Sequence, residues 1–250
     1  MNVKLISCTP EPEKIVAAAA KNCYSGASVD AIMDGLTEDA IASLMDRLAE
    51  IGHESPLEHA SFTFAIEGVS RSLLAQITRH RIASFSVQSQ RYVRQKGFEY
   101  VVPPEIEAVP AAKTLFQLAM KADQKVYEEL TETLMGKYIP ELIASGVSEK
   151  EAYRRAEKKA IEDARYVFPN ACTTKIVMTM NARELRHFFR LRCCNRAQWE
   201  IQELADKMLA LCTEAAPHLF QNAGAPCEHG VCTEGKMSCG QPRRRTADEV

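Results

Sequence analysis

Hydrophobic residues at every second position mark the expected strands of this chain. Apolar and more polar side chains alternate over residues 62–66 and again over 176–180, which is the pattern of a strand with one buried face. The segment VKLISC, at residues 3–8, predicts a third short strand that Pro10 closes. This alternation favours a sheet covered on one face over a doubly wound sheet.

Hydrophobic residues three or four positions apart predict helices over most of the remaining chain. The expected helices cover residues 11–24, 37–52, 70–80, 105–136, 148–167 and 181–220, the last in one or two pieces. Thr37 predicts an N-cap, and Ser148 with Glu151 three positions later predicts a capping box. Residues 82–100 are expected to be irregular or strand-like. These elements predict an α/β protein of the mixed α+β kind. One helix-rich domain at 1–220 surrounds a small mixed or antiparallel sheet, and a Cys/Gly-rich tail follows at 221–250.

The composition is that of a soluble globular protein. Of the 250 residues, 46% are hydrophobic and 26% are charged, which argues against a disordered, collagenous or disulfide-scaffold chain. No apolar run approaches the roughly 20 residues that span a bilayer. The formal net charge of −2 argues against non-specific nucleic-acid binding. The chain starts without the apolar core of a secretory signal. Six of its nine cysteines, those before the tail, are expected to be thiols of an intracellular protein. A cytoplasmic protein with no membrane or nucleic-acid partner is therefore expected.

A polar cluster at residues 76–92 is the first candidate binding site. Gln76, Arg79 and His80 are spaced so that they project from one face of the predicted helix. The segment that follows, up to Tyr92, adds two arginines, three serines and two glutamines. Guanidinium groups bind phosphate in a bidentate manner, while hydroxyl and carboxamide groups supply directional hydrogen bonds to a base or ribose. A solvated charged loop is the alternative that composition alone leaves open.

The helix predicted from Asn181 carries the second candidate. At about 100° per residue, Arg192 falls in one stripe with the apolar Leu185 and Phe188. The basic residues on the other side of this helix are Arg183, Arg186, His187 and Arg190. A guanidinium on an apolar face is costly unless an anionic or strongly polar group meets it, so Arg192 is expected to face either a ligand or an internal carboxylate. Arg165, just before the break YVFP, is a weaker candidate of the same kind.

Several motifs of nucleotide-binding and hydrolytic enzymes are absent from the sequence. There is no Walker lysine loop, no GxGxxG after a strand and no GxSxG elbow. Cys193 and Cys194 have no base beside them in the sequence. The chain thus offers an anion-binding and hydrogen-bonding site without a recognisable nucleophile, as expected when a cofactor carries the difficult chemistry.

The segment RHRIASFSVQSQRY closely resembles the signature of flavin-dependent thymidylate synthases, which is Arg-His-Arg, seven further residues and Ser. Arg79, His80, Arg81 and Ser89 meet that spacing. The segments HESPLEHASFTF at 53–64 and NARELRHFFRLRCCNRAQWEI at 181–201 agree with the same family. The resemblance covers roughly residues 1–220 and rests on three ordered motifs.

The resemblance implies a homotetramer of mixed α/β fold that makes dTMP from dUMP. The one-carbon unit would come from 5,10-methylenetetrahydrofolate, and the reducing equivalents from NADPH through FAD. Flavin contacts are implied for Ser55, Glu58, Arg79, His80, Arg81, Ile82, Val87, Asn181, Arg183 and His187. Contacts with dUMP are implied for Gln76, Arg79, Val87, Gln88, Ser89, Gln90, Arg91, Arg165 and Arg192. Among these, Arg192 would contact the uracil and favour ionisation at N3, as the catalytic residue.

The sequence departs from the family pattern at three places. Many members carry Asn-Glu where this chain has Ser86-Val87, so only the backbone of Val87 could serve the site. His187 and Arg196 stand where relatives often have Asn and His. The flavin contacts at these positions are therefore expected to differ in detail.

The tail from residue 221 lies outside the resemblance. Cys227, Cys232 and Cys239, with His229 between them, are soft ligands in number sufficient for a zinc site, although no tight CxxC pair is present. Free thiols and a redox-sensitive disulfide are the alternatives. The terminal PRRRTADEV, at 242–250, is expected to be disordered.

A non-catalytic nucleotide- or RNA-binding module is the alternative function. It would use the two basic clusters to hold its ligand without turnover. A yellow protein with a flavin spectrum would favour the enzyme, and a colourless protein that shifts RNA would favour the module.

Overall fold

The computed structural model describes residues 1–243 and divides into two compact units. Unit 1 comprises residues 1–67, 75–86 and 176 onward, and unit 2 comprises residues 68–74 and 87–175. The domain boundary expected near residue 220 stays a prediction. Disorder was expected over residues 242–250. Residues 244–250 lie outside the described residues, but at Arg243 the expectation is wrong, because this side chain is hydrogen-bonded to Asp206.

A four-stranded sheet follows the alternating segments of the sequence. Its strands are β1 (Asn2–Cys8), β2 (Ser61–Ser70), β3 (Ala83–Val87) and β4 (Thr173–Asn181), in the order β1-β2-β4-β3. β1 runs antiparallel to β2, with Asn2 opposite Glu67 and Cys8 opposite Phe62. The hydroxyls of Thr63 and Thr179 join β2 to β4 at 2.9 Å. The prediction of a helix-rich fold around a small antiparallel sheet is confirmed.

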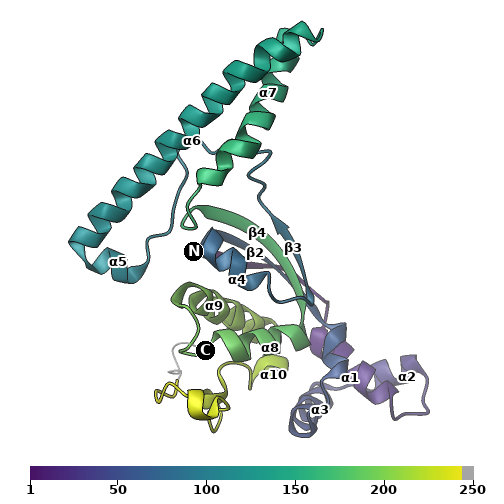
Figure 1. Ribbon diagram of the computed structural model, residues 1–250. Helices are drawn as coiled ribbons and strands as arrows, with labels where there is room; N and C mark the ends of the chain where they lie inside the picture. Colours follow the sequence, from purple (N-terminus) through teal and green to yellow (C-terminus); the bar gives the residue numbers. More distant parts are fainter. Residues whose placement is uncertain (244–250) are drawn as a thin grey trace. The chain divides into compact units, whose positions relative to one another are not determined.

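The core of unit 1 lies between β2 and three helices near the end of the chain. These helices are α8 (Ala182–Arg192), α9 (Trp199–Ala215) and α10 (Pro217–Phe220), and Figure 1 shows them together. Phe62, Phe64 and Ile66 of β2 are completely buried, as their alternation predicted. The ring of Phe220 lies 5.3 Å from that of Phe62, edge to face. Burial of these large side chains, at about 1.5–3 kcal/mol each, holds β2 and α10 together.

Three further helices of unit 1 begin and end where local sequence signals allow. They are α1 (Pro12–Asn22), α2 (Val29–Asp34) and α3 (Glu38–Ile51). The Thr37 hydroxyl caps α3 by accepting a hydrogen bond from the Ala40 amide at 3.3 Å. Gly52 ends α3 with a φ of 68°, which glycine adopts without the strain that a Cβ would add. The sequence did not predict α2, which Ser28 caps.

Unit 2 is a long helical hairpin with an irregular segment packed against it. Its helices are α5 (Pro104–Ala108), α6 (Pro110–Ala144) and α7 (Glu149–Ala164), with a single turn at Arg165–Val167. α6 and α7 lie side by side, as Figure 1 shows, around Met135, Tyr138, Ala156 and Ala160. α4 (Arg71–Ile77) begins in this unit and ends in unit 1.

Two local predictions for this hairpin are wrong. The helix expected over 105–136 breaks at Val109, because Pro110 starts a new helix at its first position, and α6 then continues past Pro140 to Ala144. The capping box expected before α7 does not form. The Ser148 side chain makes no cap hydrogen bond, and the Glu151 carboxylate instead accepts hydrogen bonds from Arg154 and Arg155.

Within the described residues, every helix is either too short or too polar to cross a membrane.

Candidate functional site

The Arg79-His80-Arg81 segment follows the end of α4 and does not continue it. α4 ends at Ile77, and the next turn is closed by hydrogen bonds from the Arg79 amide to the Gln76 carbonyl and from the His80 amide to the Ile77 carbonyl, at 3.3 and 3.1 Å. The helix expected over 70–80 therefore ends before Arg79 and His80, and the α-helical spacing used to place them on one face with Gln76 does not extend to them. Arg79 and Arg81 are exposed, whereas His80 between them is 7% exposed.

His80 lies between a carboxylate and a guanidinium from α8. Its Nδ1 is 3.1 Å from Oε1 of Glu184, and its Nε2 accepts a hydrogen bond from Nε of Arg192 at 3.3 Å. Burial lowers the pKa of His80, and the nearby Arg192 acts in the same direction, while Glu184 opposes them. Since Nε2 accepts the hydrogen bond from Arg192, the imidazole is in its neutral form, with one N–H and one lone pair.

Arg192 occupies the apolar side of α8, as its position in the helix predicted. Leu185 and Phe188, which share its stripe, are completely buried, and Arg192 itself is half-buried. Burial lowers the pKa of Arg192, and the neighbouring Arg79 lowers it further. The sequence left two partners open for this guanidinium, a ligand or an internal carboxylate. The structure has an internal carboxylate, Glu184, but it does not contact Arg192 directly, because the His80 ring lies between them.

Glu184 is a residue that the sequence analysis missed. It is 8% exposed although it is charged. On the helical wheel it lies about 60° from Asn181, at the edge of the stripe that contains Phe188. This position could have identified Glu184 from the sequence, because a carboxylate at the edge of a buried stripe needs a hydrogen-bonding partner.

The other side of α8 carries the proposed flavin contacts. Arg183 forms ion pairs with Glu58 and, at 3.5 Å, with Glu54. Asn181 caps the helix, because its side-chain oxygen accepts a hydrogen bond from the Glu184 amide at 2.9 Å. The Ser55 hydroxyl lies 3.0 Å from Nε2 of His53. Arg81, Ile82, Arg183 and His187 are exposed, so a ligand can reach them.

Arg186 is less exposed than the other three basic residues on its side of α8. It is half-buried, and its Nη1 donates to the carbonyl of Leu219 at 2.7 Å, because α10 packs against this part of α8. Burial lowers the pKa of Arg186, although Glu54 opposes this effect. With His187 and Arg190 it lines a pocket of about 270 Å³ that the tail closes from the other side.

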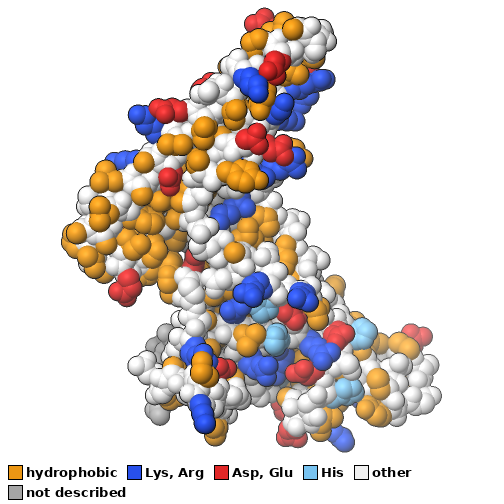
Figure 2. Space-filling model, in the orientation of Figure 1, with side chains coloured by type: hydrophobic (Ala, Val, Ile, Leu, Met, Phe, Trp, Pro, Cys, Tyr) orange, Lys and Arg blue, Asp and Glu red, His pale blue; other side chains and the backbone are white. Residues whose placement is uncertain are grey.

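The charge around α8 suits an anionic ligand. Figure 2 shows basic side chains gathered over this part of the surface. The arginines are Arg79, Arg81, Arg183, Arg186, Arg190 and Arg192, and the carboxylates near them are Glu54, Glu58 and Glu184. This excess of positive charge, together with exposed Ile82, fits a ligand with phosphate groups and an apolar ring system, as FAD has.

Unit 2 holds the other implied dUMP contacts. Arg91 pairs with the carboxylate of Glu162 at 2.7 Å, and Nε of Arg165 donates to the Glu162 carbonyl at 3.0 Å. The structure thus brings Arg91 and Arg165 to the same residue. The Ser89 hydroxyl accepts a hydrogen bond from the Arg91 amide at 3.1 Å. Val87 ends β3, and its side chain has no polar atom to replace the family's Glu.

Arg71 is a second residue that the sequence analysis missed, and no spacing pattern pointed to it. Its Nη2 donates to the carbonyl of Gln88 at 3.0 Å. Within the described residues, its buried Nε has no hydrogen-bond partner. Burial lowers the pKa of Arg71, and the nearby Arg165 contributes to this shift. Two guanidinium groups close to each other, one with a buried unpaired N–H, fit a phosphate group between or beside them.

The tail residues do not gather into a metal site in the part of the chain that the structure describes. No three His, Cys, Asp or Glu residues among residues 1–243 are placed to hold a metal ion. Cys227, Cys232 and Cys239 are thiols without a disulfide partner. His229 instead approaches the carbonyl of Ala223 at 3.4 Å.

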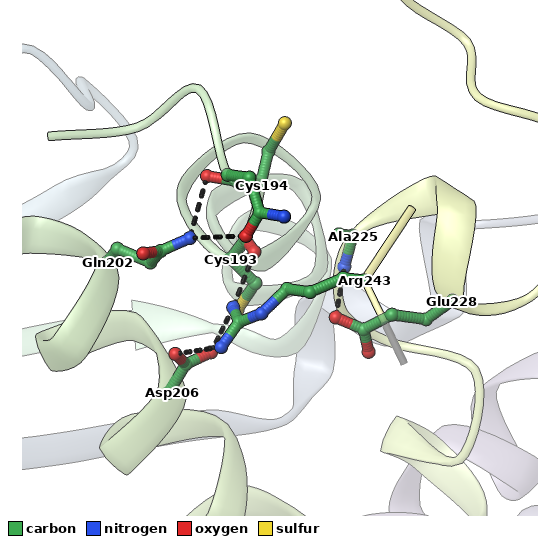
Figure 3. A network of polar contacts seen from close by, with 8 residues as sticks. Cys193, Cys194, Gln202, Asp206, Ala225, Glu228 and Arg243 are labelled. Atoms are coloured by element: carbon green, nitrogen blue, oxygen red, sulfur yellow. Dashed lines mark hydrogen bonds and ion pairs between the residues drawn. The ribbon is translucent and has the colours of Figure 1, made fainter. Parts of the chain in front are cut away.

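The tail docks on the connection between α8 and α9, directly after Arg192. Figure 3 shows Arg243 reaching Asp206 of α9 through two hydrogen bonds, at 2.8 and 2.6 Å, and the Cys193 carbonyl at 2.5 Å. From the other side, Gln202 donates to the Cys194 carbonyl at 3.0 Å. The backbone after Arg192 is therefore held by both the tail and α9.

The helix-rich α+β fold carries basic side chains around α8 and a second basic pair at Arg91 and Arg165, and guanidinium groups of this kind suit a ligand with phosphate groups. A family model described as "Thymidylate synthase complementing protein" matches residues 4–218. The chain therefore belongs to the flavin-dependent thymidylate synthase family.

Curated relatives carry that name. The flavin-dependent thymidylate synthase of Clostridium tetani is 54% identical over 241 residues, which cover 96% of this chain and 94% of that protein. The Geobacter sulfurreducens protein of the same name is 45% identical over 243 residues, with the same coverage. The crystal structure of the Helicobacter pylori flavin-dependent thymidylate synthase complexed with FAD and dUMP has a TM-score of 0.62. It is 25% identical and covers 90% of this chain and 100% of that one. The family, the enzyme class and the flavin cofactor predicted from the sequence are confirmed.

Proposed function

We propose that this protein makes dTMP by reductive methylation of dUMP, with 5,10-methylenetetrahydrofolate as one-carbon donor and NADPH as reductant. Bound FAD supplies the redox chemistry and mediates the transfer. The observation that carries the proposal is the half-buried Arg192, whose guanidinium is held through Nε by His80. Its two terminal nitrogens have no partner among the hydrogen bonds of residues 1–243 and are available to a ligand.

Arg192 is proposed to stabilise negative charge on the uracil. When the N3 proton leaves, charge develops on N3 and the neighbouring carbonyl oxygen, and a fork of two N–H groups matches these two atoms. A guanidinium that is already fixed and partly desolvated stabilises such a charge more strongly than one in water. Gln76 and Arg79 are proposed as further contacts with dUMP in unit 1.

The phosphate of dUMP is proposed to bind in unit 2. The residues for this role are Val87, through its backbone, Gln88, Ser89, Gln90, Arg91 and Arg165. The unpaired Nε of Arg71 and the closeness of Arg71 to Arg165 support an anion there. Arg71 orients the Gln88 carbonyl and therefore the start of this segment.

Flavin is proposed to contact Ser55, Glu58, Arg79, His80, Arg81, Ile82, Val87, Asn181, Arg183 and His187. The exposure of Arg81, Ile82, Arg183 and His187 supports this set. The ion pairs of Arg183 with Glu54 and Glu58 keep its guanidinium at the surface of α8.

The active protein is proposed to be a cytoplasmic homotetramer. α6 exposes Leu115, Leu118, Val126 and Leu130, which lie on one side of the helix, and a second copy of the chain would cover them. Figure 2 shows hydrophobic side chains over α5 and the neighbouring part of α6.

One preparation tests these statements together. The purified protein is expected to be yellow, to elute with a mass near four chains in light scattering, and to form dTMP from dUMP only when the folate and NADPH are both present. Omission of each reactant in turn is the control. A colourless protein that retards RNA in a gel and forms no dTMP would refute the enzyme and support the binding module.

A further inference from the structure

Three side chains from two segments form a continuous hydrogen-bonded series inside unit 1. Glu184 and Arg192 lie two turns apart on α8, and His80 enters between them from the turn after α4. The contacts are Glu184 Oε1 to His80 Nδ1 at 3.1 Å and Arg192 Nε to His80 Nε2 at 3.3 Å. Glu184 and His80 are almost fully buried, and the Phe188 ring lies 5.0 Å from the imidazole.

The directions of these two hydrogen bonds determine where the imidazole proton lies. Arg192 can only donate, so Nε2 of His80 must offer a lone pair. The single proton of the neutral ring is then on Nδ1, where it is donated to the Glu184 carboxylate. Without that acceptor, the ring would be free to carry its proton on Nε2, and an N–H would then face the N–H of Arg192.

The hydrogen bond from Nε to His80 also determines which N–H groups of Arg192 stay available and how they are oriented. Arg192 has five donors in one plane, and His80 engages the one on Nε. The edge formed by Nη1 and Nη2 is then held in one orientation, since the guanidinium cannot rotate without breaking its bond to His80. Arg192 is repelled by Arg79 and has no carboxylate of its own within the described residues, so His80 is its anchor.

We propose that Glu184 is a positioning residue, which holds His80 in the Nδ1–H form so that the imidazole anchors Arg192 with its terminal nitrogens directed at the uracil of dUMP. This role rests on the proposed function, in which Arg192 contacts the uracil. Glu184 itself touches neither substrate nor flavin, and it acts through the imidazole alone.

The decisive variants are Glu184→Gln and Glu184→Ala. The amide oxygen of Gln can still accept the Nδ1–H hydrogen bond, whereas Ala removes the acceptor. Glu203→Gln is the matched control, because Glu203 is an exposed glutamate of α9 that pairs with Lys207. Flavin content, thermal unfolding, dUMP dissociation constant and steady-state turnover are measured for the parent and all three variants.

The Ala variant is expected to lose about 10- to 100-fold in kcat/KM for dUMP while its flavin spectrum stays that of the parent. The Gln variant is expected to recover most of that loss, and the control to match the parent. A merely structural role of Glu184 would lower thermal stability without this difference between Gln and Ala in kcat/KM. A folded, flavin-loaded Ala variant within twofold of the parent overturns the proposal, and so does a Gln variant as impaired as Ala.

A second readout does not depend on turnover or on the Ala variant folding. In protein labelled with ¹⁵N-histidine, the imidazole nitrogens of His80 report which of them carries the proton. The proton is expected on Nδ1 in the parent and in Glu184→Gln. A proton on Nε2 of His80 in the parent overturns the assignment. If the parent forms no dTMP, the proposed function fails, and this spectrum still decides whether Glu184 sets the imidazole.

Discussion

Replacing Arg192 by Ala removes the guanidinium that is proposed to contact the uracil. The guanidinium is half-buried at the end of α8 and is anchored through Nε to His80. Truncation leaves the lone pair on Nε2 of His80, whose ring packs against Phe188, without its donor.

The loss of turnover should be much larger than the loss of stability. An unpaired buried acceptor costs about 1–3 kcal/mol. Removal of a charge that burial already disfavours offsets part of this cost, because the lowered pKa of Arg192 shows that the folded protein disfavours its charged form. The net decrease in unfolding free energy is therefore expected to be about 1 kcal/mol. A fixed electrostatic group at a developing charge is worth about 2–4 kcal/mol, which corresponds to a loss of about 30- to 1,000-fold in kcat.

The assay compares kcat and KM for dUMP in Arg192→Ala, Arg192→Lys and Arg190→Ala, with flavin content and denaturant unfolding measured on the same samples. Lys keeps the charge but cannot donate to His80 and present a fork at once, so it should restore only part of the rate. Arg190 is exposed on the same helix and controls for loss of one positive charge. A kcat of Arg192→Ala within threefold of the parent would refute the role given to Arg192.

Three further outcomes follow from the described contacts. Arg243→Ala should lower the unfolding free energy by about 1 kcal/mol in urea, and Asp206→Asn by less, because the pair is bidentate but partly exposed; an unchanged midpoint would contradict docking of the tail. Cys193→Ser and Cys194→Ser, singly and together, should keep dTMP formation within a few fold of the parent, since the proposed mechanism uses no thiolate; a thousandfold loss with intact flavin binding would restore a thiolate mechanism. His80 has a pKa below its unfolded value, so its contribution to stability is complete above about pH 6.5 and is lost as the pH falls from there toward the folded pKa. The melting temperature of the parent should therefore drop more steeply between pH 7 and 5 than that of His80→Gln, and parallel curves would contradict this.

Local patterns were sufficient to predict the elements that carry most of the core. Alternation identified β2 because Phe62, Phe64 and Ile66 bury one face of a strand, and Thr37 with Gly52 marked both ends of α3. Helical periodicity also placed Arg192 on the buried side of α8. These predictions depend only on neighbouring residues along one element, which is why they succeeded.

What the sequence did not predict has two origins. The burial of Arg186 and Arg71 depends on contacts between segments distant in sequence, whereas the end of α4 and the missing capping box depend on contacts within one segment. The helix carrying Gln76 stops at Ile77, so the wheel drawn through His80 did not apply. Arg186 is covered by α10, and the burial of Arg71 arises in unit 2, where its backbone amide donates to the Cys172 carbonyl. The Glu151 carboxylate binds two arginines of its own helix and does not take part in a capping box with Ser148. The spacing of residues along one helix or strand indicates neither of these effects, because it does not say which partner a side chain will contact.

α8 carries the proposed flavin contacts Arg183 and His187 on one side, and the positioning residue Glu184 and the proposed uracil contact Arg192 toward the other. Its 11 residues form a single rigid element of three turns. A shift of this helix by half a turn, about 2.7 Å, would displace the contacts on both sides at once. Adaptation to a different flavin pose would thus disturb the anchoring of Arg192, and the reverse is also true. Substitutions that move α8 would therefore disturb both the flavin contacts and the anchoring of Arg192. Sequence variation should accumulate in the segments around α8 before it changes the position of the helix itself.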